Sequence, residues 1–307
     1  MQERESIFKE TRKREEREEI EFLDWMQEIS DKIQSLRKNI NFETETYFER
    51  KKELEKEMIR ETKDDPEKIS FIKVLFGIDD VIERQKLRRT LEGKKDVNLA
   101  EEDAAWQGYA VKFILANRED TDTLQDFWGH YDFLFTRRDE DKLAQEQKSG
   151  ILGVVAAARF FNKKNMKVIL SRPKEDAEKK IDLLVIPHER KRDSQISPEK
   201  ENLILALQIK CRSVNPEEKL IKVFKGDISY STEDSTEEND FRKGCKKFAE
   251  EIKRNVLGLF ITIPRNIYYG GKFISLLDEE TGILNEKGQK LLELAIDREE
   301  EIKLIKR

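Results

Sequence analysis

Residues 203–211 read Leu-Ile-Leu-Ala-Leu-Gln-Ile-Lys-Cys, and this apolar run constrains the fold more than any other segment. In an extended strand, successive side chains point to opposite faces. One face of this strand is then wholly apolar, whereas Gln208 and Lys210 project side by side from the other face. An unpaired amide costs on the order of 1–3 kcal/mol when buried, and a charge costs more. The two polar side chains therefore need partners or a function.

A carboxylate is predicted to lie opposite this pair. In the apolar run 181–188, Ile181, Leu183 and Val185 share one face, and Asp182 opens the strand on the other face. Side chains on adjacent strands interact across a sheet when they share a face. We therefore expect Asp182 to face Gln208 and Lys210.

The surrounding periodicities predict a fold of the α/β (α+β) class. From residue 143 onward, helical and strand patterns alternate in the order α-β-β-β-α-β. The expected elements are a helix at 143–163, strands at 166–171, 181–188 and 202–211, a helix at 239–254, and a strand at 256–263. The polar stretch 213–239 has too little apolar content to pack, which predicts a loop.

Asp182 followed by Gln208-Ile209-Lys210, in this order of elements, resembles the core of the PD-(D/E)XK (restriction-endonuclease-like) nuclease superfamily. Gln208 stands where the second acid of the motif is usual. The resemblance covers residues 143–264 of the 307-residue chain. It implies a metal-dependent phosphodiesterase, a DNA endonuclease of DNA processing or defence, and DNA is favoured over RNA as its partner.

The chemistry of such a site suits these residue types. Mg²⁺ or Mn²⁺ takes hard oxygen ligands, which Asp182, the Gln208 amide and the Ile209 peptide carbonyl can supply. Lys210 is expected to orient the attacking water or to stabilise charge on the phosphoryl group. Family members usually carry a further Glu on the first helix, after a Gly-x-x-Gly such as 150–153. Val154 stands there instead, so Glu146 is the nearest acid.

Basic residues surround the predicted cleft and are candidates for phosphate contacts. The residues we expect to bind nucleic acid are Arg212, Arg242, Lys243, Lys246 and Lys247. Arg190, Lys191 and Arg192 follow the second strand and would add to this charge. An ordinary solvated helix face remains the alternative interpretation of the basic helix.

The first part of the chain is predicted to be helical throughout. Residues 1–66 contain a heptad seam, and residues 67–140 read as short helices at 69–76, 81–91, 99–117 and 123–135. The seam consists of Phe22, Met26, Ile29, Ile33, Leu36 and Ile40. Such a seam serves self-association or intramolecular packing, so we expect residues 20–60 to pair subunits or to contact a protein partner. The nuclease-like domain then comprises residues 141–307.

Composition limits the protein further. Charged residues make up 41% of the chain, yet the formal net charge is only −5, so any nucleic-acid surface must be local. Two cysteines cannot build a disulfide framework. The Glu- and Arg-rich start lacks the apolar region of a signal peptide, and no run is long enough to span a membrane. We expect a cytoplasmic protein with no membrane partner.

Three interpretations remain open at this point. The leading one is an Mg²⁺-dependent nuclease behind a coiled-coil region. The missing helix acid favours a second one, a nuclease-like fold that binds nucleic acid or protein without cutting. In the third, the coiled coil is the functional scaffold. Asp176 is either a second site carboxylate or a polar turn residue, and His130 is a weaker candidate than a packed side chain among aromatics.

Overall fold

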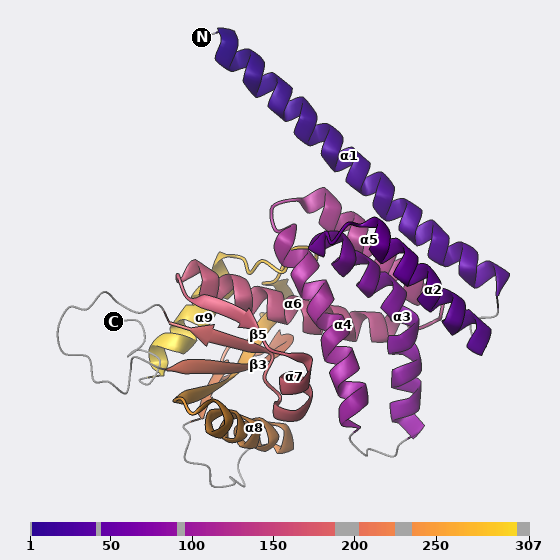
Figure 1. The fold of residues 1–307 in the computed structure, drawn as a ribbon. Helices are drawn as coiled ribbons and strands as arrows, with labels where there is room; N and C mark the ends of the chain where they lie inside the picture. The colour runs from indigo at the N-terminus through magenta and orange to yellow at the C-terminus, as the bar shows by residue number, and fades with distance from the viewer. Residues whose placement is uncertain (1, 41–43, 91–95, 188–202, 225–234, 300–307) are drawn as a thin grey trace. The chain divides into compact units, whose positions relative to one another are not determined.

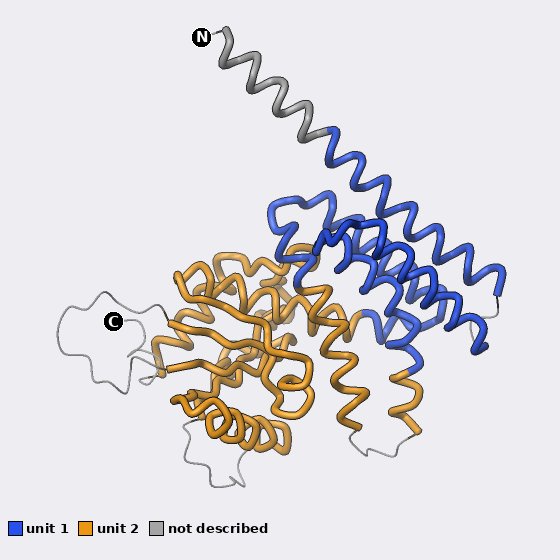
Figure 2. Tube along the Cα trace, viewed as in Figure 1, with its two compact units in different colours: residues 1–83, 112–144 blue, residues 84–111, 145–307 orange. Residues whose placement is uncertain are grey.

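The computed structural model describes residues 2–40, 44–90, 96–187, 203–224 and 235–299, with side chains from Arg17 onward. The chain divides into two compact units, shown in different colours in Figure 2. Unit 1 comprises residues 1–83 and 112–144, and unit 2 comprises residues 84–111 and 145–307. No helix in the described part of the chain is both long and apolar enough to cross a membrane.

Unit 1 is built from helices (Figure 1). They are α1 (Gln2–Asn39), α2 (Glu45–Glu61), α3 (Pro66–Thr90), α4 (Val97–Ala116) and α5 (Thr121–Thr136), of which α3 and α4 continue into unit 2. The seam residues Met26, Ile29 and Ile33 are at most 1% exposed, and Trp25 packs on Phe71 of α3. The seam is therefore an intramolecular packing face, and these three side chains are not available to a second copy.

The two short helices predicted at 69–76 and 81–91 are one continuous helix, α3. Glycine and adjacent aspartates at 77–80 weaken helix propensity, which suggested a break there. The buried carboxylate of Asp79 instead accepts hydrogen bonds from Arg37 and Arg138, so tertiary contacts hold the helix through this segment. Local helix propensity contributes less to the conformation than such tertiary contacts do.

Unit 2 holds a six-stranded mixed sheet with helices on its faces. Its elements are α6 (Asp141–Lys163, of which residues 145–163 belong to unit 2), β1 (Lys167–Leu170), α7 (Pro173–Lys179), β2 (Leu183–Ile186), β3 (Ile204–Val214), β4 (Ile221–Phe224), α8 (Thr236–Ile252), β5 (Val256–Tyr269), β6 (Lys272–Ser275) and α9 (Glu286–Arg298). The strand order is β1-β2-β3-β5-β4, and β6 pairs with β5. β1, β2 and β3 are antiparallel neighbours, and α8 connects the chain to β5, which is parallel to β3.

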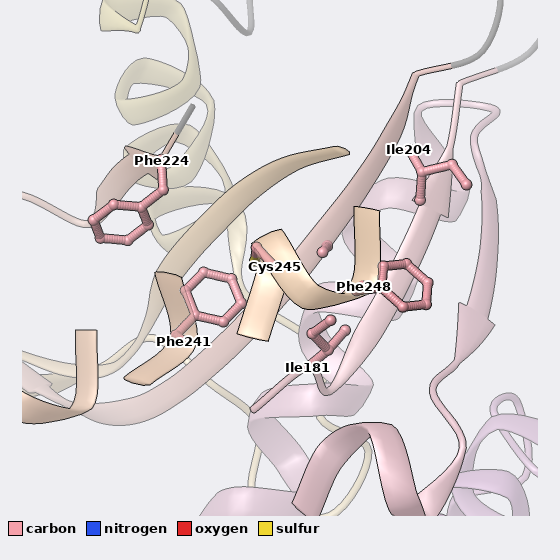
Figure 3. Close-up of a cluster of buried hydrophobic side chains, with 7 residues drawn as sticks. Ile181, Ile204, Phe224, Phe241, Cys245 and Phe248 are labelled. Atoms are coloured by element: carbon pink, nitrogen blue, oxygen red, sulfur yellow. The ribbon is translucent and has the colours of Figure 1, made fainter. Parts of the chain in front are cut away.

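The two faces of β3 pack against different helices. Ile204 and Ala206 belong to a buried cluster with Phe241, Cys245 and Phe248 of α8 (Figure 3). On the other face, a Cβ added at Gly153 of α6 would lie 2.7 Å from the Cβ of Cys211. Because side chains alternate along a strand, Gln208 and Lys210 lie on the face that carries α8.

Three elements of unit 2 were not predicted. Helix α7 occupies a stretch interpreted as a turn, strand β4 interrupts the expected loop 213–239, and β6 forms a hairpin with β5. Each is only four to seven residues long. Periodicity is weak over such lengths, so neighbouring elements rather than local pattern decide their conformation.

Candidate functional site

Asp182 directly precedes β2, beside the middle of β3. The antiparallel register of the two strands pairs Leu183 with Leu207. The Asp182 N–H donates to the Leu207 carbonyl at 2.8 Å, and the Ile209 N–H donates to Asp182 Oδ2 at 2.5 Å. Asp182 therefore contacts the segment of β3 that carries Gln208 and Ile209.

The environment of Asp182 favours its protonated form. Burial raises the pKa of this carboxyl group well above its usual range, and the negative charge of Asp176 raises it further. The Ile209 N–H and the ammonium groups of Lys210 and Lys180 act in the opposite direction. A carboxylate in this condition would gain from a nearby cation, because a positive charge favours the ionised form.

Asp176 is the second carboxylate of the group. It lies on α7, a helix rather than the turn considered from sequence, and burial raises its pKa to about 6. Lys180 and Lys210 lower this pKa, but less strongly than burial raises it. Two carboxylates that raise each other's pKa values, or share a cation, are typical of functional sites.

Close packing between α7 and α8 fixes the position of Asp176. A Cβ added at Gly244 of α8 would lie 2.0 Å from the backbone oxygen of Lys179, so only glycine fits there. Lys179 also pairs with Glu251 of α8. Gly244 thus allows α7 to approach closely enough to place Asp176 beside the sheet.

The side chain of Gln208 has an unsatisfied acceptor. It is only 4% exposed, and its Oε1 atom has no hydrogen-bond partner among the described residues. Such an orphan costs about 1–3 kcal/mol and calls for an explanation, a bound ion or water being one. The Ile209 carbonyl points to the same edge of β3 as the Leu207 carbonyl. The pairing with β2 does not extend as far as Ile209, so β2 does not cover this carbonyl.

Lys210 shares a face with Gln208 and forms an ion pair with Glu237. Glu237 lies in the first turn of α8, and its neighbour Glu238 pairs with Lys222 of β4 at 2.6 Å. The sequence analysis did not select Glu237. Glu237 lies two residues before the predicted helix 239–254, in the stretch expected to be a loop, and gave no signal that it would reach β3.

Glu146 is not part of this group. It is exposed on α6, the helix that packs against the opposite face of β3. The charges of Lys180 and Lys210 lower the pKa values of both aspartates, and the charge of Asp176 raises the pKa of Asp182. Asp176, rather than Glu146, is therefore the carboxylate that accompanies Asp182.

The predicted phosphate-binding residues fall into two sets. Lys243, Lys246 and Lys247 are exposed on α8. Of these, Lys247 also pairs with Glu178 at 3.4 Å. The Arg242 guanidinium lies 4.7 Å from the centre of the Phe224 ring, and Arg212 pairs with Glu218. Residues 190–192 lie outside the described residues.

The His130 ring makes an edge contact with Phe71 in unit 1, with ring centres 6.2 Å apart, and burial lowers its pKa. Cys211 and Cys245 are thiols whose pKa values burial raises to about 12. A thiol is reactive only as thiolate, so neither cysteine is a nucleophile at neutral pH.

The oxygen donors of the site suit a hard divalent cation. Within the described ranges, no three His, Cys, Asp or Glu side chains cluster in a way that would hold a metal ion. The available donors are instead two carboxylates, the orphan Gln208 oxygen and the Ile209 carbonyl. This all-oxygen set fits Mg²⁺ or Mn²⁺, which keep water ligands and need few protein carboxylates.

Comparison of the chain with models of protein families, with curated proteins and with solved structures gives no match.

Proposed function

We propose that unit 2 is a metal-dependent phosphodiesterase acting on nucleic acid, DNA before RNA, with a restriction-endonuclease-like core. One observation carries this proposal: Asp182 accepts the Ile209 N–H between Gln208 and Lys210, and the Gln208 Oε1 atom has no hydrogen-bond partner among the described residues. Asp176 adds a second carboxylate beside them. Burying these groups together destabilises the fold, and a cation with a phosphate would relieve the cost.

The order of elements supports the same proposal. A helix, three antiparallel strands, a crossover helix and a strand parallel to the third are the α-β-β-β-α-β arrangement that the resemblance implies. Helix α7 and strand β4 are additions to that arrangement. Fold alone does not assign function, so the argument depends on the side chains.

In the proposed reaction, Asp176, Asp182, the Gln208 amide and the Ile209 carbonyl hold Mg²⁺ or Mn²⁺. The bound cation supplies a Lewis acid that polarises the phosphoryl oxygen and lowers the pKa of a coordinated water. The Lys210 ammonium stabilises the negative charge that grows on the phosphoryl group. Lys243, Lys246 and Lys247 on α8 neutralise backbone phosphates, which makes binding fall with salt.

The ion pair between Lys210 and Glu237 must break before Lys210 can contact the substrate. In its present geometry the ammonium group donates to the Glu237 carboxylate and cannot also donate to a phosphate. The dianionic transition state competes for Lys210 better than the ground state does, so this exchange favours catalysis. The ion pair also supports a second candidate: a nuclease-like protein that binds nucleic acid without cutting, with Lys210 held permanently by Glu237.

Cleavage assays separate the two candidates. Linear, branched and single-stranded DNA and RNA would be incubated with Mg²⁺ or Mn²⁺ and wild-type protein, Lys210→Ala or Asp182→Asn. Lys56→Ala, an exposed lysine on α2, is the matched control. We expect cleavage by wild type and control only, with a loss of roughly 100-fold or more in each site variant.

A thermal-shift titration with Mn²⁺ gives a readout independent of cleavage. Wild type should be stabilised by the ion, because a ligand that binds only the folded state raises its stability. Asp182→Asn should lose this response. Cleavage that persists in both site variants would remove the proposed centre, whereas binding without cleavage by wild type would favour the second candidate.

A further inference from the structure

The β5–β6 hairpin carries aromatic rings on its surface. Tyr268 and Phe273 are paired across the two strands, their ring centres are 5.1 Å apart, and they are 45% and 66% exposed. Tyr269 at the end of β5 is also 66% exposed. Buried aromatics usually supply a core, so rings left on a hairpin surface indicate a binding function.

The turn makes this hairpin a defined platform. Gly270 and Gly271 both have positive φ, 58° and 80°, which is the geometry of a two-residue type I′ turn. Ile267, the neighbour of Tyr268, is only 4% exposed and anchors β5 in the core. The backbone that carries the rings is therefore regularly paired between β5 and β6 and is fixed to the core by Ile267.

Positive charge accompanies the rings. Lys272 is the cross-strand partner of Tyr269, and the ammonium of Lys287 in α9 lies 5.7 Å from the centre of the Tyr269 ring. Residues 266–275 contain no acidic residue. Aromatic faces with adjacent ammonium groups suit bases joined by phosphates, since every base has a face to stack and each phosphate is negative.

The hairpin follows the C-terminal end of β5, and Lys210 lies in the C-terminal half of the neighbouring parallel strand β3. β3 and β5 are parallel, with Lys210 paired to Thr262, and β5 continues from there to Tyr269. Six residues of strand separate Thr262 from Tyr268, which is about 20 Å. The register of β3 and β5 shifts between Arg212 and Val214, so this spacing gives a distance along β5 and not a shared face of the sheet.

The size of the patch argues against a stable protein partner. Four large apolar side chains are exposed on the hairpin, namely Tyr268, Tyr269, Phe273 and Ile274. Stable protein interfaces involve about 20–30 residues on each side. A ring pair of this size matches one or two stacked bases.

We infer that the β5–β6 hairpin binds single-stranded nucleic acid by stacking bases on Tyr268 and Phe273, with Lys272 and Lys287 contacting phosphates. The inference rests on the proposed function for its class of ligand. It goes further by assigning single-stranded segments, and therefore ends, flaps or branch points, as the part of the substrate that this surface recognises.

Binding without metal tests the inference independently of catalysis. The probes are a fluorescein-labelled oligothymidylate and a labelled duplex, measured by anisotropy in EDTA at low salt. Tyr268→Ala/Phe273→Ala should bind the single strand about fivefold or more weakly, the least expected for losing a stacked base, with duplex affinity little changed. The matched control, Ile283→Ala/Leu294→Ala, removes two exposed apolar side chains elsewhere in unit 2 and should bind like wild type.

Three outcomes would overturn the inference: unchanged affinity for the single strand, equal loss for single strand and duplex, or a change of oligomeric state in place of a change in nucleic-acid binding. Tyr268→Phe/Phe273→Tyr keeps both rings and should restore binding. If the hairpin binds but the protein does not cleave, the catalytic proposal fails and this inference stands. If wild type cleaves and the hairpin variants cleave equally well, the catalytic proposal stands and the hairpin inference fails.

Discussion

Asp79 in unit 1 is buried and Asp182 in unit 2 is half-buried, and the two carboxyl groups have very different surroundings. In unit 1, Asp79 is 1% exposed and accepts hydrogen bonds from Arg37, Arg138 and Tyr47, at distances that include 2.7, 2.8 and 2.5 Å. In unit 2, Asp182 accepts the Ile209 N–H and lies near the Asp176 carboxylate, and the Gln208 Oε1 atom has no partner among the described residues. The Asp79 cluster is saturated with donors, whereas around Asp182 the ammonium groups of Lys180 and Lys210 offset burial and the second carboxylate only in part.

This difference separates a structural cluster from a functional one. The Asp79 cluster joins α1, α2, α3 and Arg138, the second residue after α5. Burial together with Asp79 raises the pKa of Tyr47, which keeps that hydroxyl a donor. The carboxylate oxygens of Asp79 already accept hydrogen bonds from these groups, so they do not need a ligand. The carboxylates of the Asp182 cluster could still bind a cation, and the unliganded arrangement costs stability.

The largest effect is expected from breaking the saturated cluster. Asp79→Ala leaves two guanidinium groups buried without their carboxylate, which should cost about 3–5 kcal/mol of stability. Asp182→Asn is the comparison, because it removes a charge that is poorly compensated and should cost little or stabilise the protein. Chemical denaturation of both variants measures the contrast. Equal losses would show that the two aspartates have the same structural role.

A smaller effect is expected from the glycine that positions Asp176. Gly244→Ala forces a methyl group against the Lys179 carbonyl, so α7 must shift, at a cost of about 1–3 kcal/mol. The shift should also weaken the thermal response to Mn²⁺. Gly108→Ala in α4 is the matched control, since nothing lies within 4 Å of its added Cβ, and it should stabilise the helix by about 0.5–1 kcal/mol. A Mn²⁺ response that survives Gly244→Ala would exclude Asp176 from the site.

The site residues of the long strand β3 could be predicted from sequence, because alternation puts Gln208 and Lys210 on one face of it. For Asp176 the sequence left two interpretations open, a site carboxylate or a turn residue, because a seven-residue helix has too little periodicity to be recognised. Glu237 was not selected, because its contact with Lys210 depends on how α8 docks. Likewise, the seam of α1 was recognised as a packing face, but periodicity does not say whether the partner is another chain or the same chain.

The pH dependence of stability gives the smallest effect and the most direct test of the unsaturated cluster. The folded-state pKa of Asp176 is raised to about 6, above the value near 3.9 usual for an unfolded chain. The folded state therefore binds the extra proton between about pH 4 and 6, and stability contributed by this group is lost as pH rises through that window. Asp182 acts in the same direction.

In Asp176→Asn, denaturation curves across this window should show a flatter decline in unfolding free energy than in wild type. The difference between the two proteins should narrow at neutral pH when Mn²⁺ is added, because the ion favours the ionised carboxylates of wild type. The control is Asp122→Asn, an exposed residue in the first turn of α5, which should follow the wild-type curve. A slope identical in wild type and Asp176→Asn would mean that the two carboxylates do not share a proton-binding environment, and the contrast with Asp79 would then rest on hydrogen bonding alone.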